Sequence, residues 1–316
     1  MLKPITGSAT VPRIAVLLPC FNEEAAIGQT IAGFRAALPD AAIYVYDNNS
    51  KDGTRAAAAA AGAIVRGERM QGKGNVVRRM FADIDADVYI MADGDATYDA
   101  QAAPELVARL LDEQLDMVVG ARKSEVEQAY RRGHRFGNRL LTGMLAQLFG
   151  RSFSDILSGY RVFSRRFVKS FPALARGFET ETEISVHALE LAMPVAEVIT
   201  AYGARPEGSH SKLSTWRDGW RILKTIVHLF RIERPVLFYG MISLVLLLTA
   251  FILAVPLAIT YVQTGLVPRF PTAILVTGLT LVAALSFACG LILDTVVRGR
   301  REVRRLAYLS FPAPGT

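Results

Sequence analysis

Cysteine is scarce, since the 316 residues include only Cys20 and Cys289, too few for a disulfide-stapled scaffold. Cys289 lies inside a long apolar segment and Cys20 follows a short one, so we expect both to stay unpaired, and they leave the redox compartment undefined. The chain also lacks the low hydrophobicity of a disordered protein, because 51% of its residues are hydrophobic. Its 25 glycines and 14 prolines are too few for a collagen repeat. What remains is a folded chain with ample length to bury a core.

Two nucleotide-binding fingerprints are absent. No G-x-G-x-x-G follows the first predicted strand, residues 14–18, which argues against a dehydrogenase-type dinucleotide fold. The segment Gly72–Asn75 contains a lysine but lacks the leading glycine and the Ser or Thr of a P-loop, which argues against ATP hydrolysis. Residues 1–13 lack the apolar core of a secretory signal, so we expect the first ~230 residues to be cytosolic.

Charge is missing from two long apolar segments, residues 237–262 and 272–293. About 20 apolar residues cross a hydrocarbon core of about 30 Å, and buried helices of a globular core seldom run this long without a polar face, so we predict a membrane-spanning hairpin. The link between the segments has a single basic residue, Arg269. The outer flanks of the two segments are rich in basic residues: Arg221, Lys224, Arg231, Arg234, Arg298, Arg300, Arg301, Arg304 and Arg305. The positive-inside rule therefore predicts a multi-pass protein of the inner (plasma) membrane with both termini in the cytoplasm.

A helix rich in aromatic and basic residues is predicted just before the first span, over residues 214–234. Its apolar side chains recur at steps of four and three: Trp216, Trp220, Leu223, Val227 and Phe230. This pattern favours a helix that lies in the lipid headgroup layer, with Trp216 and Trp220 at the membrane interface. An amphipathic helix packed on the domain's own core is the alternative.

Short apolar runs alternate with helical patterns up to residue 213, which predicts an α/β domain with a mostly parallel, doubly wound sheet. The predicted strands are 14–18, 43–46, 63–65, 88–91 and 117–119. The predicted helices are 24–37, 54–61, 75–83, 101–113, 136–149 and 182–191. Polar clusters follow the first, second, fourth and fifth strands, where ligands bind in such sheets. We divide the chain into a globular domain at 1–213, the interfacial helix at 214–234, the two-helix hairpin at 235–297 and a basic cytosolic tail at 298–316.

Two aspartates, Asp93 and Asp95, stand at the end of the fourth predicted strand. Residues two apart in extended chain point the same way, so their carboxylates can converge on one divalent cation that substrate phosphates complete. An EF-hand is excluded, because Tyr98 stands where its loop needs glycine and Pro104 where it needs glutamate. Helix capping is the structural alternative, and Asp99 alone could provide it.

Further charged residues follow other predicted strands. Asp47, after the second strand, is placed to take a ribose or base edge, while Asp52 suits the turn that follows. Arg122 follows the fifth strand, and its guanidinium suits bidentate contacts to phosphate. Further basic residues follow it, Arg161 among them, and a solvated face is the simplest interpretation for most of this group.

An alternating acidic series, Glu179, Glu181 and Glu183, offers either a sugar contact or surface acid. On a strand these side chains would share a face, whereas on a helix they would point apart. The net charge of +7 gathers beside the apolar segments without a nucleic-acid motif, so no nucleic acid partner is expected.

Taken together, the motifs resemble glycosyltransferase family 2 with the GT-A fold, in the polyprenyl-phosphate branch whose prototype is dolichol-phosphate mannose synthase. The resemblance covers residues 11–235 and is followed by the hairpin that several bacterial relatives carry. Its seven motifs, in the family's order, are Leu18–Glu24, Asp47–Ser50 with Asp52–Thr54, Gly72–Gly74, Asp93–Asp95, Gly120–Arg122, Asp155 with Ser158–Arg161, and Gly208–Ser209 with Ser211–Lys212.

The resemblance implies a role for each matched position. The implied nucleotide-binding residues are Pro19, Phe21, Glu23, Asp47, Lys73, Asp93 and Gly94. The implied ligands of Mg²⁺ or Mn²⁺ are Asp93 and Asp95, and the implied catalytic residues are Asp95, Arg122 and Lys212. The implied contacts to acceptor and phosphate are Arg139, Arg205, Ser211 and Lys212. The candidate sugar contacts are Asp155, Glu179 and Glu181.

One departure from the family concerns the residues after the second aspartate. Mannose synthases usually have Leu-Gln there, with the Gln assisting the metal, and this chain has Ala96-Thr97. The third metal ligand is therefore either Thr97 or a water molecule. The same change weakens the case for GDP-mannose as the donor.

The resemblance implies an inverting, metal-dependent transfer of a hexose from a nucleotide sugar, with a UDP-sugar preferred, to a membrane polyprenyl phosphate such as undecaprenyl phosphate. The product would serve glycan or envelope assembly. The alternatives are GDP-mannose as donor, and a non-catalytic membrane-anchored scaffold that retains the fold. A processive polysaccharide synthase is disfavoured, because its Gln-x-x-Arg-Trp motif and additional spans are missing. A homo-oligomer is permitted but not required.

Overall fold

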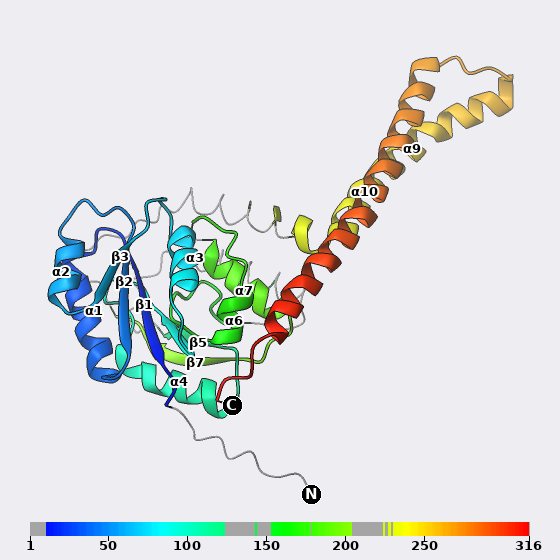
Figure 1. Ribbon diagram of the computed structural model, residues 1–316. Helices are drawn as coiled ribbons and strands as arrows, with labels where there is room; N and C mark the ends of the chain where they lie inside the picture. Colours follow the sequence, from blue (N-terminus) through cyan, green and yellow to red (C-terminus); the bar gives the residue numbers. More distant parts are fainter. Residues whose placement is uncertain are drawn as a thin grey trace, which may run out of the picture. The chain divides into compact units, whose positions relative to one another are not determined.

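The computed structural model describes residues 11–123, 143, 153–177, 179–203, 224, 227–228 and 230–315. The chain forms two compact units (Figure 1). The first consists of Met1–Ile222 together with Arg304–Thr316, and the second consists of Leu223–Val303.

The first unit is built on one seven-stranded sheet, whose strands lie in the order β3-β2-β1-β4-β6-β5-β7. The strands are β1 (Ile14–Cys20), β2 (Ala42–Asp47), β3 (Ile64–Gly67), β4 (Val88–Met91), β5 (Met117–Lys123), β6 (Arg161–Ser164) and β7 (Val195–Ala201). All neighbouring pairs are parallel except those of β6, which runs antiparallel to β4 and to β5. This mostly parallel sheet confirms the predicted fold class.

Helices cover both faces of the sheet (Figure 1). They are α1 (Glu24–Ala37), α2 (Thr54–Ala60), α3 (Lys73–Asp83), the 3₁₀ turn η1 (Ala100–Ala102), α4 (Ala103–Asp112), α6 (Arg165–Ser170) and α7 (Thr180–Glu190). Helix α1 contacts α2 and α4, while α3 contacts α6 and α7, so the two groups form separate layers. All four residues of β4 are fully buried, as expected of a strand with helices on both sides.

Strands β6 and β7 were not predicted, although β1, β2 and β4 lie where the apolar runs place them. Strand β6 has only four residues and leads directly into α6, so it is too short to show the residue pattern of a strand. Strand β7 lies at the sheet edge, and its exposed Ile199 breaks the pattern of an apolar run facing a core. The predicted helix at 136–149 lies outside the described residues apart from Gly143.

A buried histidine, His187 on α7, lies between the rings of Phe167 and Phe171, whose centroids are 5.3 and 5.4 Å away. Its Nε2 is 3.1 Å from the Ser170 hydroxyl. Burial, and to a smaller extent the positive charge of Arg304, lowers the pKa of His187 to about 3. His187 is therefore a neutral core residue at physiological pH.

This histidine makes the stability of the first unit depend on pH. The unfolded chain binds a proton at His187 below pH ~6.5 while the folded chain does not, so stability falls as the pH drops from about 6.5 toward 3, by up to about 1.4 kcal/mol per pH unit. We expect His187→Phe to reduce the loss of melting temperature between pH 7.5 and pH 5.5, measured by thermal unfolding of the detergent-solubilised chain. His228→Gln, at an exposed position of the second unit, is the control. An equal loss in His187→Phe and wild type would contradict the assignment.

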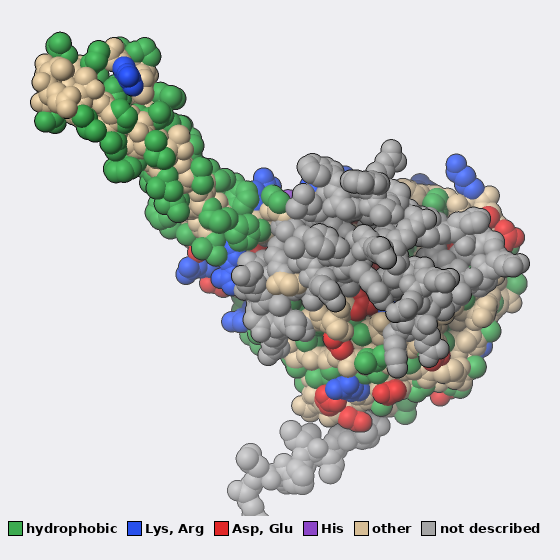
Figure 2. All heavy atoms as spheres, turned by 180° about the vertical axis from the view of Figure 1, so that it is seen from behind, with side chains coloured by type: hydrophobic (Ala, Val, Ile, Leu, Met, Phe, Trp, Pro, Cys, Tyr) green, Lys and Arg blue, Asp and Glu red, His purple; other side chains and the backbone are tan. Residues whose placement is uncertain are grey.

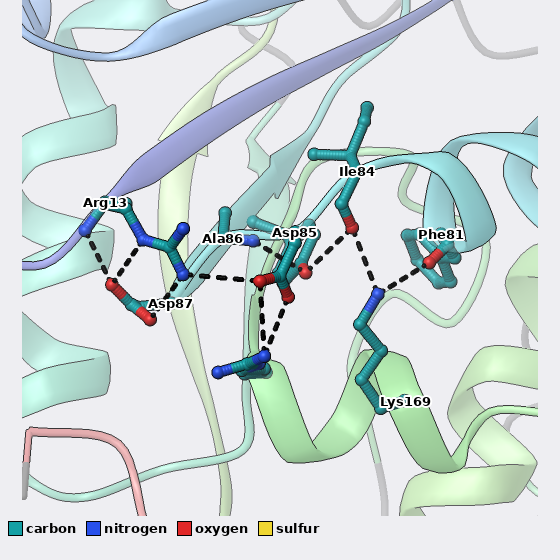
Figure 3. A network of polar contacts seen from close by, with 9 residues as sticks. Arg13, Phe81, Ile84, Asp85, Ala86, Asp87 and Lys169 are labelled. Carbon is teal, nitrogen blue, oxygen red and sulfur yellow. Dashed lines mark hydrogen bonds and ion pairs between the residues drawn. The ribbon is translucent and has the colours of Figure 1, made fainter.

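Ion pairs join the amino-terminal edges of β1 and β4 (Figure 3). Arg13 Nε lies 3.4 Å from Asp87 Oδ2, and Asp85 accepts from Arg13 and Arg165. Lys169 Nζ donates to the carbonyl oxygens of Phe81 and Ile84 at the end of α3. Arg13, Asp85 and Asp87 are largely exposed, so each pair contributes little to stability. These residues lie at the opposite edge of the sheet from the polar motifs and serve below as controls.

The C-terminal segment, Arg304–Gly315, belongs to the first unit. Arg304 forms an ion pair with Glu190 at the end of α7. The Tyr308 hydroxyl donates to Asp116 at 2.8 Å, and the Arg166 guanidinium lies 4.7 Å from the centre of the Tyr308 ring. The segment therefore packs against the residue before β5, the start of α6 and the end of α7.

The second unit contains two long apolar helices, α9 (Pro235–Thr264) and α10 (Phe270–Leu309), the second of which continues into the C-terminal segment. By length and composition both could cross a membrane. Figure 2 shows hydrophobic side chains covering the surface of this unit. Gly290 of α10 lies against Tyr239 and the carbonyl of Pro235, where an added Cβ would come within 3.2 Å of the tyrosine Cβ. Trp216 and Trp220 of the predicted interfacial helix lie outside the described residues.

Candidate active site

The polar motifs gather at the carboxyl ends of the parallel strands. Strands β1, β2 and β4 are adjacent and parallel, so the loops that follow them meet at one edge of the sheet. This is the edge at which open α/β sheets bind ligands.

The loop after β1 and the turn after β2 are joined by reciprocal hydrogen bonds. The Asn22 backbone N–H donates to Ser50 Oγ at 2.8 Å, and the Lys51 N–H donates to Asn22 Oδ1 at 2.8 Å. The Glu23 N–H donates to Thr54 Oγ1 at 2.9 Å. Asn22 has φ +53°, a left-handed conformation that asparagine tolerates better than most residues. The two motifs therefore form one surface, which also carries Pro19 and Phe21.

The end of β2 carries Asp47, whose side chain is only 3% exposed. Both of its carboxylate oxygens accept from the Ser50 N–H at 3.3 Å, and Arg55 Nη1 lies 3.7 Å away. The neighbouring Asn48 donates to the carbonyls of Glu68 and Met70 and accepts from the Gly72 N–H at 2.7 Å. Asn48 thus ties the end of β2 to the loop that leads into Lys73, a role that no local sequence pattern indicated.

The loop after β4 carries the two aspartates. Asp95 is 3% exposed, and its Oδ1 accepts from the Thr97 hydroxyl at 2.6 Å and from the Thr97 N–H at 3.3 Å. Ala96 between them has φ +57°, which is strained for a residue with a Cβ. Gly94 lies so close to Cys20 that an added Cβ would be 2.4 Å from its Sγ. Thr97 therefore positions the Asp95 carboxylate, and the loop has little freedom to vary.

Lys73, at the start of α3, lies between two carboxylates. Its ammonium forms an ion pair with Asp93 and lies 2.6 Å from Glu181 Oε1 on α7. Burial by itself would lower the pKa of Lys73, but the charges of Asp93 and Glu181 raise it well above its usual range. The Lys73 side chain therefore stays protonated and provides a fixed positive charge beside Asp93.

Glu181 is 5% exposed, and its second oxygen, Oε2, is buried without a hydrogen-bond partner among the residues that the structure describes. A buried acceptor left unmatched is costly unless a ligand donates to it. Glu183, two residues on, instead accepts from the backbone N–H groups of Leu174 and Ala175. The helix thus separates the acidic side chains, and Glu181 is the one that reaches the cluster around Asp93.

Arg122, at the end of β5, pairs with Asp155. Arg122 Nε and Nη2 donate to the two Asp155 oxygens at 2.6 and 2.8 Å, a bidentate pair that is mostly buried. The guanidinium carbon also lies 5.5 Å from the centre of the Tyr202 ring. The two guanidinium N–H groups that could bind phosphate in a bidentate way thus donate to the Asp155 carboxylate in this structure. A phosphate contact by Arg122 stays a prediction.

The segment that carries Asp155 is held from several sides. Glu197 accepts from the Ser154 N–H at 2.9 Å, the Ser158 hydroxyl donates to the Gly120 carbonyl at 2.6 Å, and the Gly159 N–H donates to the Tyr98 hydroxyl at 2.8 Å. Tyr98 and Glu197 were not identified from the sequence, because their partners lie far along the chain.

Several predicted site residues cannot be placed. Those outside the described residues are Arg139, Arg205, Ser211 and Lys212. Glu179 immediately precedes α7, and within the described part of the chain the ion pairs of Lys73 are with Asp93 and Glu181 instead. Arg161 differs from its expected place on a solvated face, because its side chain is completely buried.

Asp93 and Asp95 suit a divalent cation only when a bound substrate supplies further oxygen atoms to it. Among the residues that the structure describes, no three or more His, Cys, Asp or Glu side chains cluster as a metal cage. Asp93 and Asp95 nevertheless offer hard oxygen donors on one short loop, and Mg²⁺ is commonly held by one or two carboxylates plus substrate phosphates and water. The residues present therefore fit a cation that arrives with a diphosphate.

Comparison with known proteins agrees with this geometry. Residues 15–171 match the model for glycosyl transferase family 2. Glycosyltransferase AglJ of Haloferax volcanii is 34% identical over 255 residues, covering 80% of this chain and 84% of AglJ. The dolichyl-phosphate hexose transferase of the same organism is 27% identical over 225 residues, covering 71% of this chain and 97% of that protein.

A solved structure with the same fold is glucosyl-3-phosphoglycerate synthase from Mycobacterium tuberculosis. In complex with Mn²⁺, UDP-glucose and phosphoglyceric acid it is 25% identical, with a TM-score of 0.56 over 69% of this chain and 79% of that one. The same enzyme has been solved with Mg²⁺ and UDP, at a TM-score of 0.57.

Proposed function

Because this chain belongs to glycosyltransferase family 2, we propose that it transfers a hexose from a nucleotide sugar, with a UDP-sugar preferred, to a polyprenyl phosphate in a membrane. The observation that carries the proposal is the cluster of Lys73, Glu181 and the partly exposed Asp93 at the carboxyl edge of the sheet, in a chain that also has two membrane-length helices. The similarity to a dolichyl-phosphate hexose transferase supports a lipid phosphate acceptor.

The donor would bind across the ends of β1, β2 and β4. Pro19, Phe21, Glu23 and Asp47 belong to the ends of β1 and β2 and the loop after β1, where the base and ribose would bind. The diphosphate would extend toward the loop of Asp93, Gly94 and Asp95, and the fixed charge of Lys73 would lie beside it. The orphaned Oε2 of Glu181 would accept a hydrogen bond from a hydroxyl of the donor sugar.

Asp93 and Asp95 would hold Mg²⁺ or Mn²⁺ against the donor diphosphate, where the cation, when bound, would stabilise the negative charge of the leaving group. The complexes of glucosyl-3-phosphoglycerate synthase with either metal and UDP support this choice. Lys73 and Arg122 would contribute positive charge from the protein itself.

The acceptor needs no general base, because a lipid monophosphate is already ionised at pH 7. Its oxygen forms a bond to the anomeric carbon while the bond from that carbon to the diphosphate breaks, and the nucleoside diphosphate leaves with the electron pair. Attack opposite the leaving group inverts the anomeric centre. The protein's contribution is alignment of the two substrates and stabilisation of the developing charge.

The membrane helices would bring this chemistry to the lipid. We propose that α9 and α10 span the inner membrane with both termini cytoplasmic, and that Trp216 and Trp220 lie at the interface beside the lipid phosphate. Arg139, Arg205, Ser211 and Lys212 would bind the acceptor phosphate. A homo-oligomer is compatible with this arrangement.

The test is transfer from a panel of radiolabelled UDP- and GDP-sugars to undecaprenyl phosphate in detergent, with Mg²⁺, Mn²⁺ or EDTA. We expect one donor to give a chloroform-soluble product, and EDTA to reduce its formation at least about a hundredfold. Asp85→Asn, at the opposite edge of the sheet, is the control and should match wild type. A product from GDP-mannose alone would replace the UDP-sugar by the alternative donor.

No product from any donor, with verified lipid and protein, would favour the alternative of a non-catalytic membrane scaffold. Calorimetry with UDP and Mn²⁺ would then separate two cases. Metal-dependent binding of UDP would indicate a transferase with a donor missing from the panel, and absence of binding would indicate the scaffold.

A further inference from the structure

Arg161, the first residue of β6, is among the largest side chains that the structure buries completely. Its Nε donates to the Ser158 carbonyl at 2.9 Å, its Nη2 donates to the Ile156 carbonyl, and its Nη1 donates to Ser185 Oγ at 2.9 Å. In the part of the chain that the structure describes, no carboxylate lies within ion-pair distance of it. Its hydrogen-bond acceptors in this part of the chain are thus all neutral, which is unusual for a buried cation.

Holding a charge this way is costly, and an apolar side chain of similar size would pack at the same place with less desolvation. Burial lowers the pKa of Arg161 to about 10, an effect that the more distant charges of Glu181 and Asp155 oppose. The guanidinium is therefore still charged at physiological pH. The carboxylates that stabilise it at a distance are the same ones that pair with Lys73 and Arg122.

The hydrogen bonds of Arg161 reach the segments that carry both carboxylates. Ile156 and Ser158 belong to the loop that begins at Asp155, and Arg161 donates to the carbonyls of both. Ser185 stands one helical turn after Glu181, and its hydroxyl donates to the Glu181 carbonyl at 3.0 Å. One buried guanidinium thus joins the Asp155 loop to the Glu181 turn of α7.

We propose that Arg161 is a positioning residue that fixes Asp155 and Glu181 from inside the protein, and through them places Arg122 and Lys73 for the diphosphate of the donor. The inference rests on the proposed function, because it assigns the two cations to that diphosphate. Arg161 itself touches no substrate. Its planar, five-donor group reaches the loop and the helix together, which the single ammonium of a lysine would not do with the same geometry.

The first test is Arg161→Lys in the full-length, detergent-solubilised protein, with the donor and metal identified by the panel. Active sites are counted by calorimetric titration with the nucleoside diphosphate of that donor. We expect kcat per site to fall at least about tenfold and the dissociation constant of the nucleoside diphosphate to rise, at a temperature well below unfolding. Arg13→Lys, an exposed arginine at the opposite edge, should change neither value.

A merely structural role would lower the melting temperature but leave the kcat per site and the nucleotide affinity at their wild-type values, and that result would overturn the proposal. A double-mutant cycle adds a second criterion. If Arg161 acts through Asp155, then Arg161→Lys should have little further effect on kcat in an Asp155→Asn background. Fully additive losses would contradict action through Asp155.

Ser185→Ala serves if Arg161→Lys does not fold, since it removes only the contact to α7. We expect a several-fold loss of kcat per site that disappears in a Glu181→Gln background and persists in an Asp155→Asn background. Wild-type activity in Ser185→Ala would overturn the proposal that Arg161 positions Glu181 through Ser185. Absence of transfer by the wild-type protein would instead count against the proposed function, so the two failures are distinguishable.

Discussion

Replacing Asp95 by Asn is expected to abolish sugar transfer, lowering kcat/KM by about a thousandfold or more, while the chain still folds and inserts into membranes. The carboxylate is buried and its Oδ1 is held by Thr97, so the neutral amide keeps the shape but loses the charge that a divalent cation requires. The metal-dependent affinity for the nucleoside diphosphate should fall together with activity, as measured by calorimetry with and without Mn²⁺.

Asp99→Asn is the matched control for this change. It makes the same substitution four residues further on, where the side chain caps η1 by accepting from the Gln101 N–H. It should leave transfer within about twofold of wild type. Turnover by Asp95→Asn at the wild-type rate with added Mn²⁺ would refute the metal assignment.

The largest expected effect on stability comes from Asp116→Ala. Asp116 is completely buried and accepts from Ser164 Oγ at 2.7 Å, from Arg166 Nε at 2.5 Å and Nη2 at 2.9 Å, and from the Tyr308 hydroxyl at 2.8 Å. Removing it leaves Arg166 as a mostly buried cation without its partner, which typically costs about 3–5 kcal/mol. The melting temperature of the detergent-solubilised chain should fall by on the order of 10 °C.

Tyr308→Phe separates the contribution of the C-terminal segment from that of the Arg166 pair. It removes one hydrogen bond to Asp116 and keeps the ring over which Arg166 lies, so about 1 kcal/mol should be lost. Limited proteolysis should also cut the C-terminal segment faster in Asp116→Ala than in wild type. An unchanged melting temperature in Asp116→Ala would show that the segment and the Arg166 pair do not support the fold.

The sequence by itself determined the elements whose pattern is local. Strands β1, β2 and β4 are continuous apolar runs, and α9 and α10 are apolar for longer than any helix of a small globular core needs. The position of Asp93 and Asp95 at a strand's carboxyl end followed from the same reading. The order of motifs along the chain was sufficient to identify the glycosyltransferase family.

Only the tertiary structure decided which charges meet. Lys73 pairs with Glu181 and Arg122 with Asp155, partners that are far apart in the chain. Contact between α3 and α7 brings the first pair together, and the pairing of β5 with β6 brings Arg122 to the segment that precedes β6. Sequence periodicity relates residues two, three or four positions apart, so it carries no information on such pairs. The burial of Arg161 was missed as well, since an arginine read alone belongs on the surface. Its carbonyl acceptors, Ile156 and Ser158, are close in the sequence, but only the fold brings Ser185 of α7 to its guanidinium.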